Sequence, residues 1–197
     1  MKQTYSTFSA KKPTFLTVPP AGAYEAVIKD VLLREPDGDK QKRTVIELMI
    51  EIIAGEYANR YDELYRDQLE RFGGNVSYKG IFRLTPPSDD DEDWRKRAFE
   101  GNLWCVEQSN PGYSWDWDEK KLKGKKVGIN VRKRLYIYNG KERETTEIGQ
   151  FETIEDVKNG KCPKLKDRDQ RNNDSGSADS TNGSEFTDVS KDVAVPW

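Results

Sequence analysis

Residues 126–138 read Lys-Val-Gly-Ile-Asn-Val-Arg-Lys-Arg-Leu-Tyr-Ile-Tyr, and Asn139-Gly140 follows directly. Apolar and polar side chains alternate along this stretch, and successive side chains of a strand point to opposite faces. The alternation therefore predicts a half-buried β-strand over Lys126–Tyr138. Asn-Gly is the strongest two-residue hairpin signal, so a return strand is predicted over Arg143–Phe151. The apolar side of the first strand consists of odd-numbered residues: Val127, Ile129, Val131, Leu135 and Ile137.

An earlier part of the chain predicts another hairpin. Gly22–Leu33 is rich in apolar and β-branched residues, and Pro36–Lys40 is a strong turn signal. Arg43–Ile53 then alternates with a period of two residues, which predicts a second half-buried strand and an antiparallel pair. One face of that strand would carry Thr44, Ile46, Leu48, Ile50 and Ile52.

The residues between the two hairpins predict one helix and leave one segment open. Tyr57–Phe72 fits the spacing of a helical stripe and also the period of a strand, and the pattern does not decide between them. Ser88 with Asp91 three residues later forms a capping-box pattern. We therefore expect a helix over Asp90–Gln108.

The order of these elements predicts a fold class. A capping pattern at Thr153 and a stop signal at Gly160 predict a short C-terminal helix over Ile154–Asn159. The chain would then be mainly β (β+α), with five short strands and a helix between the third and the fourth. This order matches the five-stranded oligonucleotide-binding (OB) barrel.

The chain divides into three parts by composition. Residues 1–20 contain three prolines and are expected to form a flexible arm, and residues 21–168 are expected to form the OB domain. Residues 169–197 are rich in Asn, Asp, Ser, Gly and Thr, cannot bury enough apolar surface to fold, and are expected to be a disordered tail. This tail carries six acids and two bases, a net charge of −4, which leaves +2 on the rest of the chain.

Composition also restricts the chemistry that the chain can perform. The 197 residues include no histidine and only two cysteines, Cys105 and Cys162. This excludes His-based catalytic triads and zinc sites that use histidine. Two distant cysteines favour a reducing compartment, and no apolar run suits a signal peptide or a membrane span. We expect a cytoplasmic protein with no cofactor, metal site or membrane association.

The even-numbered face of the strand over Lys126–Tyr138 is the first candidate site. It lacks acids and places two tyrosines beside two arginines, although an ordinary solvated strand face would also be charged. Cations neutralise phosphates, and flat rings stack on unpaired bases. The pattern therefore predicts contact with single-stranded DNA. The candidate residues are Lys126, Asn130, Arg132 and Arg134, with Tyr136 and Tyr138 as the stacking rings.

The segment before this strand adds weaker candidates. Tyr113, Trp115 and Trp117 alternate, so they fit one face, and we expect at least one of them to pack against the core instead. Trp115 and Trp117 are therefore stacking candidates of second rank. Lys125 lies in a lysine-rich turn that would either contact phosphates or simply begin the strand.

The last residues of the chain form a third candidate site. An acidic stretch ends in an apolar run and a terminal aromatic residue with a free carboxylate. A partner protein could bind the ring in a pocket and the carboxylate on a basic side chain, whereas the plain alternative is a frayed end. The candidate residues are Asp188, Asp192, Val195, Pro196 and Trp197.

The acid run Asp89–Asp93 could also be interpreted as a catalytic site. In a metal-dependent nuclease these residues would bind Mg²⁺. Acids in the first turn of a helix explain the run more simply, because they suit the positive end of the helix dipole. The chain also lacks a phosphate-binding P-loop and a dinucleotide fingerprint, so we expect a protein that is not an enzyme.

The central block of the chain resembles a known family. Ser109-Asn-Pro-Gly-Tyr113, Trp115-Asp116 and Leu122-Lys-Gly-Lys-Lys-Val-Gly128 resemble a phage and mobile-element family of small single-stranded DNA-binding proteins. The likeness extends more weakly from Gly22 to Lys166. It implies that the block joins a helix to the fourth strand of an OB barrel, and that the protein lies in the host cytoplasm if a phage encodes it.

The end of the chain resembles the tails of bacterial single-stranded DNA-binding proteins. Those tails end in acids, an apolar residue, Pro and Phe, whereas Asp192–Trp197 has fewer acids and a terminal Trp. The resemblance implies recruitment of replication or recombination proteins. The expected function is sequence-independent binding of single-stranded DNA, with the tail competing for the basic face. A protein-binding adaptor that acts on a host replication factor is the alternative, and a homodimer is left open.

Overall fold

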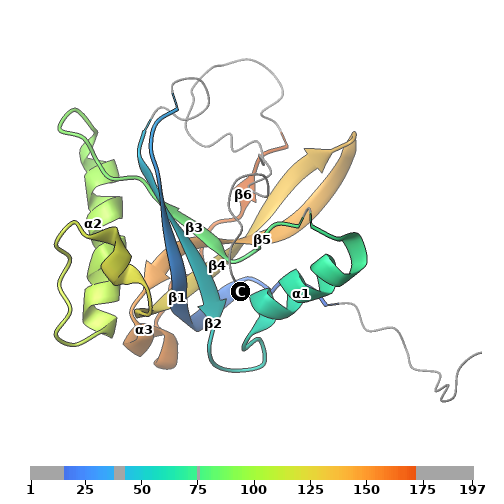
Figure 1. Ribbon diagram of the computed structural model, residues 1–197, viewed down its shortest axis with the longest axis horizontal. Helices are drawn as coiled ribbons and strands as arrows, with labels where there is room; N and C mark the ends of the chain where they lie inside the picture. The colour runs from blue at the N-terminus through green and yellow to red at the C-terminus, as the bar shows by residue number, and fades with distance from the viewer. Residues whose placement is uncertain (1–15, 38–42, 75, 172–197) are drawn as a thin grey trace, which may run out of the picture.

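The computed structural model describes residues 16–37, 43–74 and 76–171, and the fold is drawn in Figure 1. The predicted strands and helices are present, with shifted ends in several cases. The elements in chain order are β1 (Gly22–Arg34), β2 (Val45–Ile52), α1 (Arg60–Phe72), β3 (Ile81–Leu84), α2 (Asp93–Ser109), the 3₁₀ turn η1 (Glu119–Leu122), β4 (Lys126–Tyr138), β5 (Lys141–Glu152), α3 (Ile154–Lys158) and β6 (Arg168–Asp169).

One mainly β sheet organises the molecule. Its strands follow the order β3-β2-β1-β4-β5, all antiparallel, and β6 adds to β4 in parallel. The sheet therefore has six strands and is open, because β3 and β5 share no ladder within the described residues. The predicted mainly β class is confirmed, whereas the sheet has six strands in place of the expected five and does not close into a barrel. The edges nevertheless approach each other, since the rings of Phe82 on β3 and Phe151 on β5 lie 4.4 Å apart.

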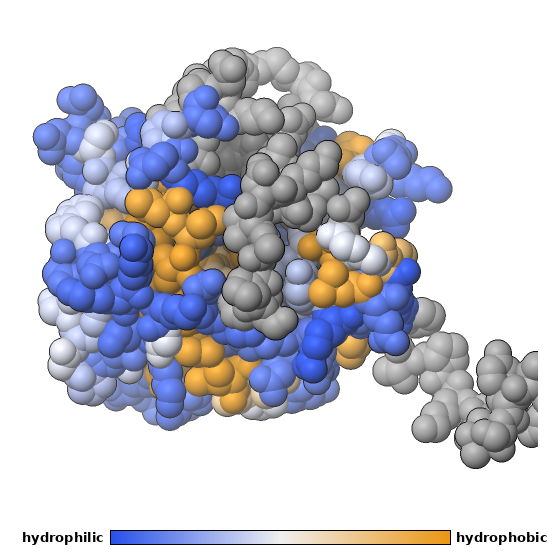
Figure 2. All heavy atoms as spheres, viewed as in Figure 1, coloured by the Kyte–Doolittle hydropathy of each residue, from blue (hydrophilic) through white to orange (hydrophobic). Residues whose placement is uncertain are grey.

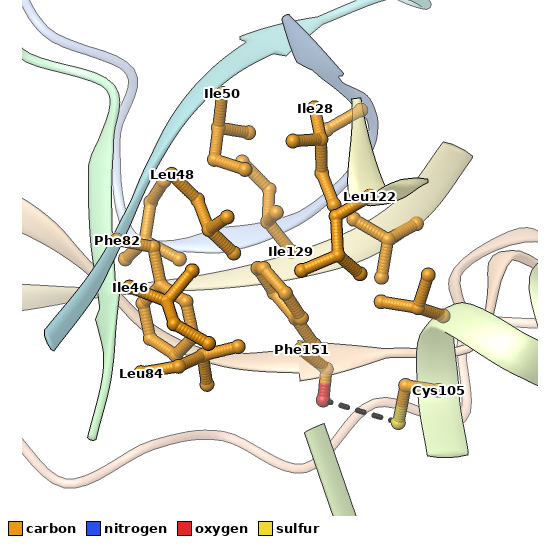
Figure 3. Packing of buried hydrophobic residues seen from close by; sticks show 14 of the residues in the cluster. Ile28, Ile46, Leu48, Ile50, Phe82, Leu84, Cys105, Leu122, Ile129 and Phe151 are labelled. Carbon is orange, nitrogen blue, oxygen red and sulfur yellow. Dashed lines mark hydrogen bonds between the residues drawn. The ribbon is translucent and has the colours of Figure 1, made fainter. Parts of the chain in front are cut away.

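The core lies on the face of the sheet that carries Ile28, Ile50 and Ile129, here called the inner face. These three residues are fully buried, as the predicted alternation of β2 and β4 requires. The core is completed by α2, which presents Phe99, Leu103 and Val106 to the sheet. Figure 3 shows how the packed side chains converge from the strands, with the Cys105 thiol directed at a backbone carbonyl of β5.

The β4–β5 hairpin forms as its turn sequence predicts. Asn139 and Gly140 both have positive φ, 50° and 69°, as a two-residue hairpin turn with the right twist requires. The register runs from Tyr138 opposite Lys141 to Gly128 opposite Glu152, with one shift that leaves Gly149 as an extra residue on β5. The hairpin is continuous over nearly the whole length of both strands.

The segment left open by the pattern is helical. Tyr57–Phe72 contains α1, so the third strand of the sheet is not there but in Ile81–Leu84. The α2 helix begins at Asp93 rather than Asp90. Its N-cap residue is Glu92, which makes no capping side-chain hydrogen bond, so the expected capping box does not cap the helix. Asp91 accepts a hydrogen bond from the backbone N–H of Ser88 at 2.8 Å, but it lies before the helix and pairs with Arg43.

The chain after β5 covers part of the outer face of β4. Thr153 caps α3 as predicted, since its side chain accepts a hydrogen bond from the N–H of Asp156. Val157 of this helix lies over Gly128, and the carbonyl of Pro163 accepts a hydrogen bond from Asn130. The chain then passes over Gly149 of β5. A Cβ atom on this glycine would lie only 2.5 Å from the side chain of Leu165.

Both ends of the described chain lie against the body of the protein. Pro19, in the expected N-terminal arm, is fully buried, and its carbonyl accepts a hydrogen bond from Thr146 at 2.7 Å. At the other end, the first residues of the expected tail lie beside β4, where the N–H of Gln170 donates to the carbonyl of Leu135 at 2.8 Å. Across the described ranges, no helix is long and apolar enough to span a membrane.

Candidate nucleic-acid interface

The outer half of the β4–β5 hairpin stands clear of the rest of the sheet. We call residues 132–138 of β4 and 141–147 of β5 the ribbon. The pairing of β1 with β4 ends at Val131, so beyond it only β5 and the short β6 flank β4. At about 3.3 Å per residue the ribbon extends for roughly 20 Å. In Figure 1 it projects from the body on the side opposite α2.

One face of the ribbon, its outer face, is basic and aromatic. Residues directly opposite each other in an antiparallel pair point to the same side. The outer face therefore combines four residues of β4 with their partners on β5. The pairs are Arg132 with Glu147, Arg134 with Thr145, Tyr136 with Arg143, and Tyr138 with Lys141. Arg168 joins this face from β6, opposite Arg134, so the face has five bases and one acid, a net charge of +4.

The inner face of the ribbon has a different character. It carries apolar side chains, one base and two acids, a net charge of −1. Its pairs are Lys133 with Thr146, Leu135 with Glu144, and Ile137 with Glu142. Lys133 is held by Glu144 at 2.9 Å, and this carboxylate raises the pKa of the Lys133 amine. A polyanion would therefore be attracted to one face of the ribbon and not to the other.

Three arginines converge on the single acid of the outer face. The carboxylate of Glu147 lies 2.8 Å from Arg132, 3.5 Å from Arg168 and 4.0 Å from Arg134. The side chains are all partly exposed. One carboxylate cannot neutralise three guanidinium groups, so the cluster keeps an excess charge of +2 and holds its arginines in fixed positions. Guanidinium groups in such an array suit phosphate oxygens.

The two tyrosines lie beyond this cluster, toward the tip of the ribbon. The guanidinium group of Arg134 lies 5.6 Å from the centre of the Tyr136 ring. Tyr138 is 61% exposed and sits next to the turn. Tyr136 is half-buried. Accessible rings beside ordered cations are the combination that binds single-stranded nucleic acid. Figure 2 shows that apolar patches on the face in view are bordered by hydrophilic residues.

The other predicted residues in and just before β4 do not lie on the ribbon. Asn130 is 3% exposed and its amide donates to Glu152 and to the carbonyl of Pro163, so its side chain is occupied within the fold. Lys126 is exposed, but it starts β4 twelve residues before Tyr138, about 40 Å away along the strand. Lys125 lies 4.4 Å above the ring of Tyr113. The lysines and the ribbon are therefore separate sites.

The tryptophan candidates lie beside α2, away from the ribbon. Trp115 is half-buried against the core, as expected for at least one of these rings, and its Nε1 is buried without a partner among the described residues. Trp117 is 66% exposed and stacks on Phe99, with ring centres 6.0 Å apart. Its φ of 68° is unusual for a bulky residue, so the fold holds this ring in place against backbone strain.

The structure gives no support to the two other predicted sites, the tail and the acid run. The tail candidates Asp188, Asp192, Val195, Pro196 and Trp197 lie outside the described residues. In the acid run, Asp91 is engaged by Arg43, which together with the Ser88 N–H lowers its pKa to about 2. Within the described ranges, no group of three or more His, Cys, Asp or Glu side chains is arranged to hold a metal ion.

Sequence reasoning missed three basic residues of the ribbon. Lys141 and Arg143 were predictable, because a two-residue Asn-Gly turn fixes the register and places them opposite Tyr138 and Tyr136. Arg168 was not predictable, since it reaches the site through the parallel pairing of β6, which has no local sequence signal.

Comparisons with known proteins leave the chain without an assigned family. No model of a known protein family matches it, and no curated protein matches it either.

Proposed function

We propose that this chain is a single-stranded DNA-binding protein, not an enzyme, and that the outer face of the ribbon is its principal contact. One observation carries the proposal: β4 and β5 give the outer face of the ribbon a net charge of +3 and two tyrosines, against −1 on the inner face of the same two strands. A strand pair that was merely solvated would need no such difference between its faces. Ordered arginines would bind phosphates, and Tyr136 and Tyr138 would stack on bases.

We further propose that the fold is an OB-fold. The strand order β3-β2-β1-β4-β5, the position of α2 between β3 and β4, and the 4.4 Å approach of Phe82 and Phe151 across the open edge support it. The OB-fold is a partly open five-stranded barrel, and its β4–β5 loop is one of the regions that bind oligonucleotides. The ribbon is the β4–β5 hairpin of this chain.

The chemistry of the ribbon suits binding that tolerates any base sequence. Arginine and lysine contacts to phosphate carry no sequence information, and every base has a flat face for stacking. The proposed role is in phage or mobile-element DNA replication or recombination, in the cytoplasm. The tail over residues 169–197 would recruit partner proteins, and its acids would compete with DNA for the ribbon.

Two neighbouring residues at the tip of the ribbon provide a matched test. Tyr138 points to the outer face and is 61% exposed, whereas Ile137 points to the inner face and is 46% exposed. Fluorescence polarisation of a labelled oligo-dT would be titrated with the wild type, Tyr138→Ala and Ile137→Ala, with duplex DNA as a control. The loss of one stacked base should weaken the binding of Tyr138→Ala roughly 5- to 150-fold.

The proposal predicts that Ile137→Ala binds like the wild type and that duplex DNA binds weakly. Raising the salt concentration should weaken the wild-type complex, because phosphate contacts release bound counterions. Equal losses in both variants, or no binding of oligo-dT at low salt, would contradict the proposal. The second outcome would favour the adaptor hypothesis, in which the fold binds a protein.

A further inference from the structure

The three arginines around Glu147 are not neutralised to the same extent. Two nitrogen atoms of Arg132, Nε and Nη2, lie 2.9 Å and 2.8 Å from one oxygen of the Glu147 carboxylate. The nearest approach of Arg168 to this carboxylate is 3.5 Å, and that of Arg134 is 4.0 Å. The attraction between opposite charges weakens with distance. Arg134 is therefore the member of the cluster with the most charge left for a phosphate.

The nearest side-chain partner of Arg134 is neutral. Its Nε–H group donates a hydrogen bond of 2.6 Å to the side-chain oxygen of Gln170. On the same arginine, the central carbon of the guanidinium group lies 5.6 Å from the centre of the Tyr136 ring. An amide oxygen fixes the direction of a guanidinium group without cancelling its charge, whereas a carboxylate would do both. Arg134 is thus held in place and still charged, which a phosphate contact requires.

Gln170 is itself fixed by the residues on both sides of it. Its N–H donates to the carbonyl of Leu135 at 2.8 Å, directly after the parallel pairing of β6 with β4. The next residue, Arg171, binds Asp169 at 2.6 Å and Glu142 on β5 at 3.2 Å. In Figure 1 β6 lies beside the sheet as a short strand far along the chain from β4. These contacts hold the side chain of Gln170 beside the outer face of the ribbon.

We propose that Gln170 is a positioning residue of the DNA-binding face, and that it holds the guanidinium group of Arg134 where this group binds a phosphate. The inference rests on the proposed function of the ribbon. It adds to the binding face a residue that the composition of the chain groups with the tail. The first residues of that tail, up to Arg171, are then part of the DNA-binding site.

Gln170→Leu removes the amide oxygen and leaves the net charge of the chain unchanged. Affinity for a labelled oligo-dT would be measured by fluorescence polarisation at several salt concentrations. The affinity should fall roughly ten-fold, and the slope of log affinity against log salt should be smaller by about one unit, because Arg134 no longer holds a phosphate. Gln108→Leu, the same exchange at an exposed position of α2, should change neither quantity.

The outcomes separate this inference from the function on which it rests. A wild type that binds oligo-dT, together with a Gln170→Leu variant that binds equally well, would overturn the role of Gln170 and leave the function of the ribbon standing. A wild type that does not bind oligo-dT would contradict the proposed function instead.

A double-mutant cycle shows whether Gln170 acts through Arg134. Once Arg134→Ala has removed the guanidinium group, Gln170→Leu should cause no further loss of affinity, because two residues that act through one contact are not additive. Equal losses in the wild-type and Arg134→Ala backgrounds would mean that Gln170 affects binding by another route, and would overturn the inference.

The hydrogen bond between the two side chains can be observed without DNA. In nitrogen–proton correlation spectra of the full chain, the Nε–H signal of Arg134, identified by its absence in Arg134→Lys, should be protected from exchange with water. Gln170→Leu should abolish this protection, whereas Gln170→Glu, which keeps an acceptor oxygen, should preserve it. A signal that is unprotected in the wild type, or still protected in Gln170→Leu, would overturn the inference whether or not DNA binds.

Discussion

The carboxylate of Glu51, on β2, accepts a hydrogen bond of 2.6 Å from the backbone N–H of Asp62 in the first turn of α1. It also accepts from the N–H of Tyr61 at 3.2 Å and from the hydroxyl of Tyr78 at 3.0 Å. Asn59, at the helix start, has no capping side-chain bond. A strand residue therefore supplies the cap of the helix, and this fixes α1 against the sheet.

Replacing this cap should destabilise the fold. Glu51→Gln keeps the size of the side chain but exchanges one acceptor oxygen for a donor NH₂ group, which leaves a buried N–H or hydroxyl unsatisfied. The free energy of unfolding should fall by about 1–3 kcal/mol, as measured by urea denaturation. Glu56→Gln, at an exposed position in the preceding turn, is the control and should change it little.

The cap also explains why the sequence left this region open. The tyrosines and leucines of Tyr57–Phe72 fit two periods, and the group that selects the helix lies on β2, outside the segment. The same reasoning applies to Arg168, which reaches the ribbon only through tertiary pairing. By contrast, β4, its Asn-Gly turn and the cap of α3 are determined by neighbouring residues and were predicted correctly. Elements that neighbouring residues determine can be predicted from the sequence, whereas contacts between residues far apart in the chain cannot.

The ion pair between Arg43 and Asp91 should make stability depend on acid pH. Hydrogen bonds from Arg43 at 2.6 Å and 2.7 Å and from the N–H of Ser88 lower the pKa of Asp91 from 3.8 to about 2. A carboxyl group whose pKa is lower in the folded state stabilises the fold above pH 3.8, and this contribution is lost as the pH falls toward 2. Asp91→Asn and Arg43→Gln should both be less stable than the wild type at pH 7.

Urea denaturation between pH 7 and pH 2 measures this effect. The difference in free energy of unfolding between the wild type and Asp91→Asn should shrink as the pH falls below 3.8 and should be smallest near pH 2. A difference that stayed constant over the whole range would show that the ion pair does not set the titration of Asp91.

Gly128 on β4 should not tolerate a side chain. A Cβ atom there would lie 2.6 Å from a methyl group of Val157 and 2.9 Å from the backbone oxygens of Glu152 and Thr153. Gly128→Ala should therefore displace α3 from β4 and lower the free energy of unfolding by about 1–3 kcal/mol. Gly101→Ala is the matched control, because it adds the same methyl group where nothing lies within 4 Å. A Gly128→Ala protein as stable as the wild type would contradict this packing.

The proposed binding face is tested most directly by removing one cation from each side of the ribbon. Arg143 points to the outer face and Lys133 to the inner face, so Arg143→Ala and Lys133→Ala change the net charge of the chain equally. Affinity for oligo-dT would be measured at several salt concentrations. The proposal predicts that Arg143→Ala binds more weakly and that its slope of log affinity against log salt is smaller by about one unit. Lys133→Ala should match the wild type in both, and equal effects of the two substitutions would contradict the proposed face.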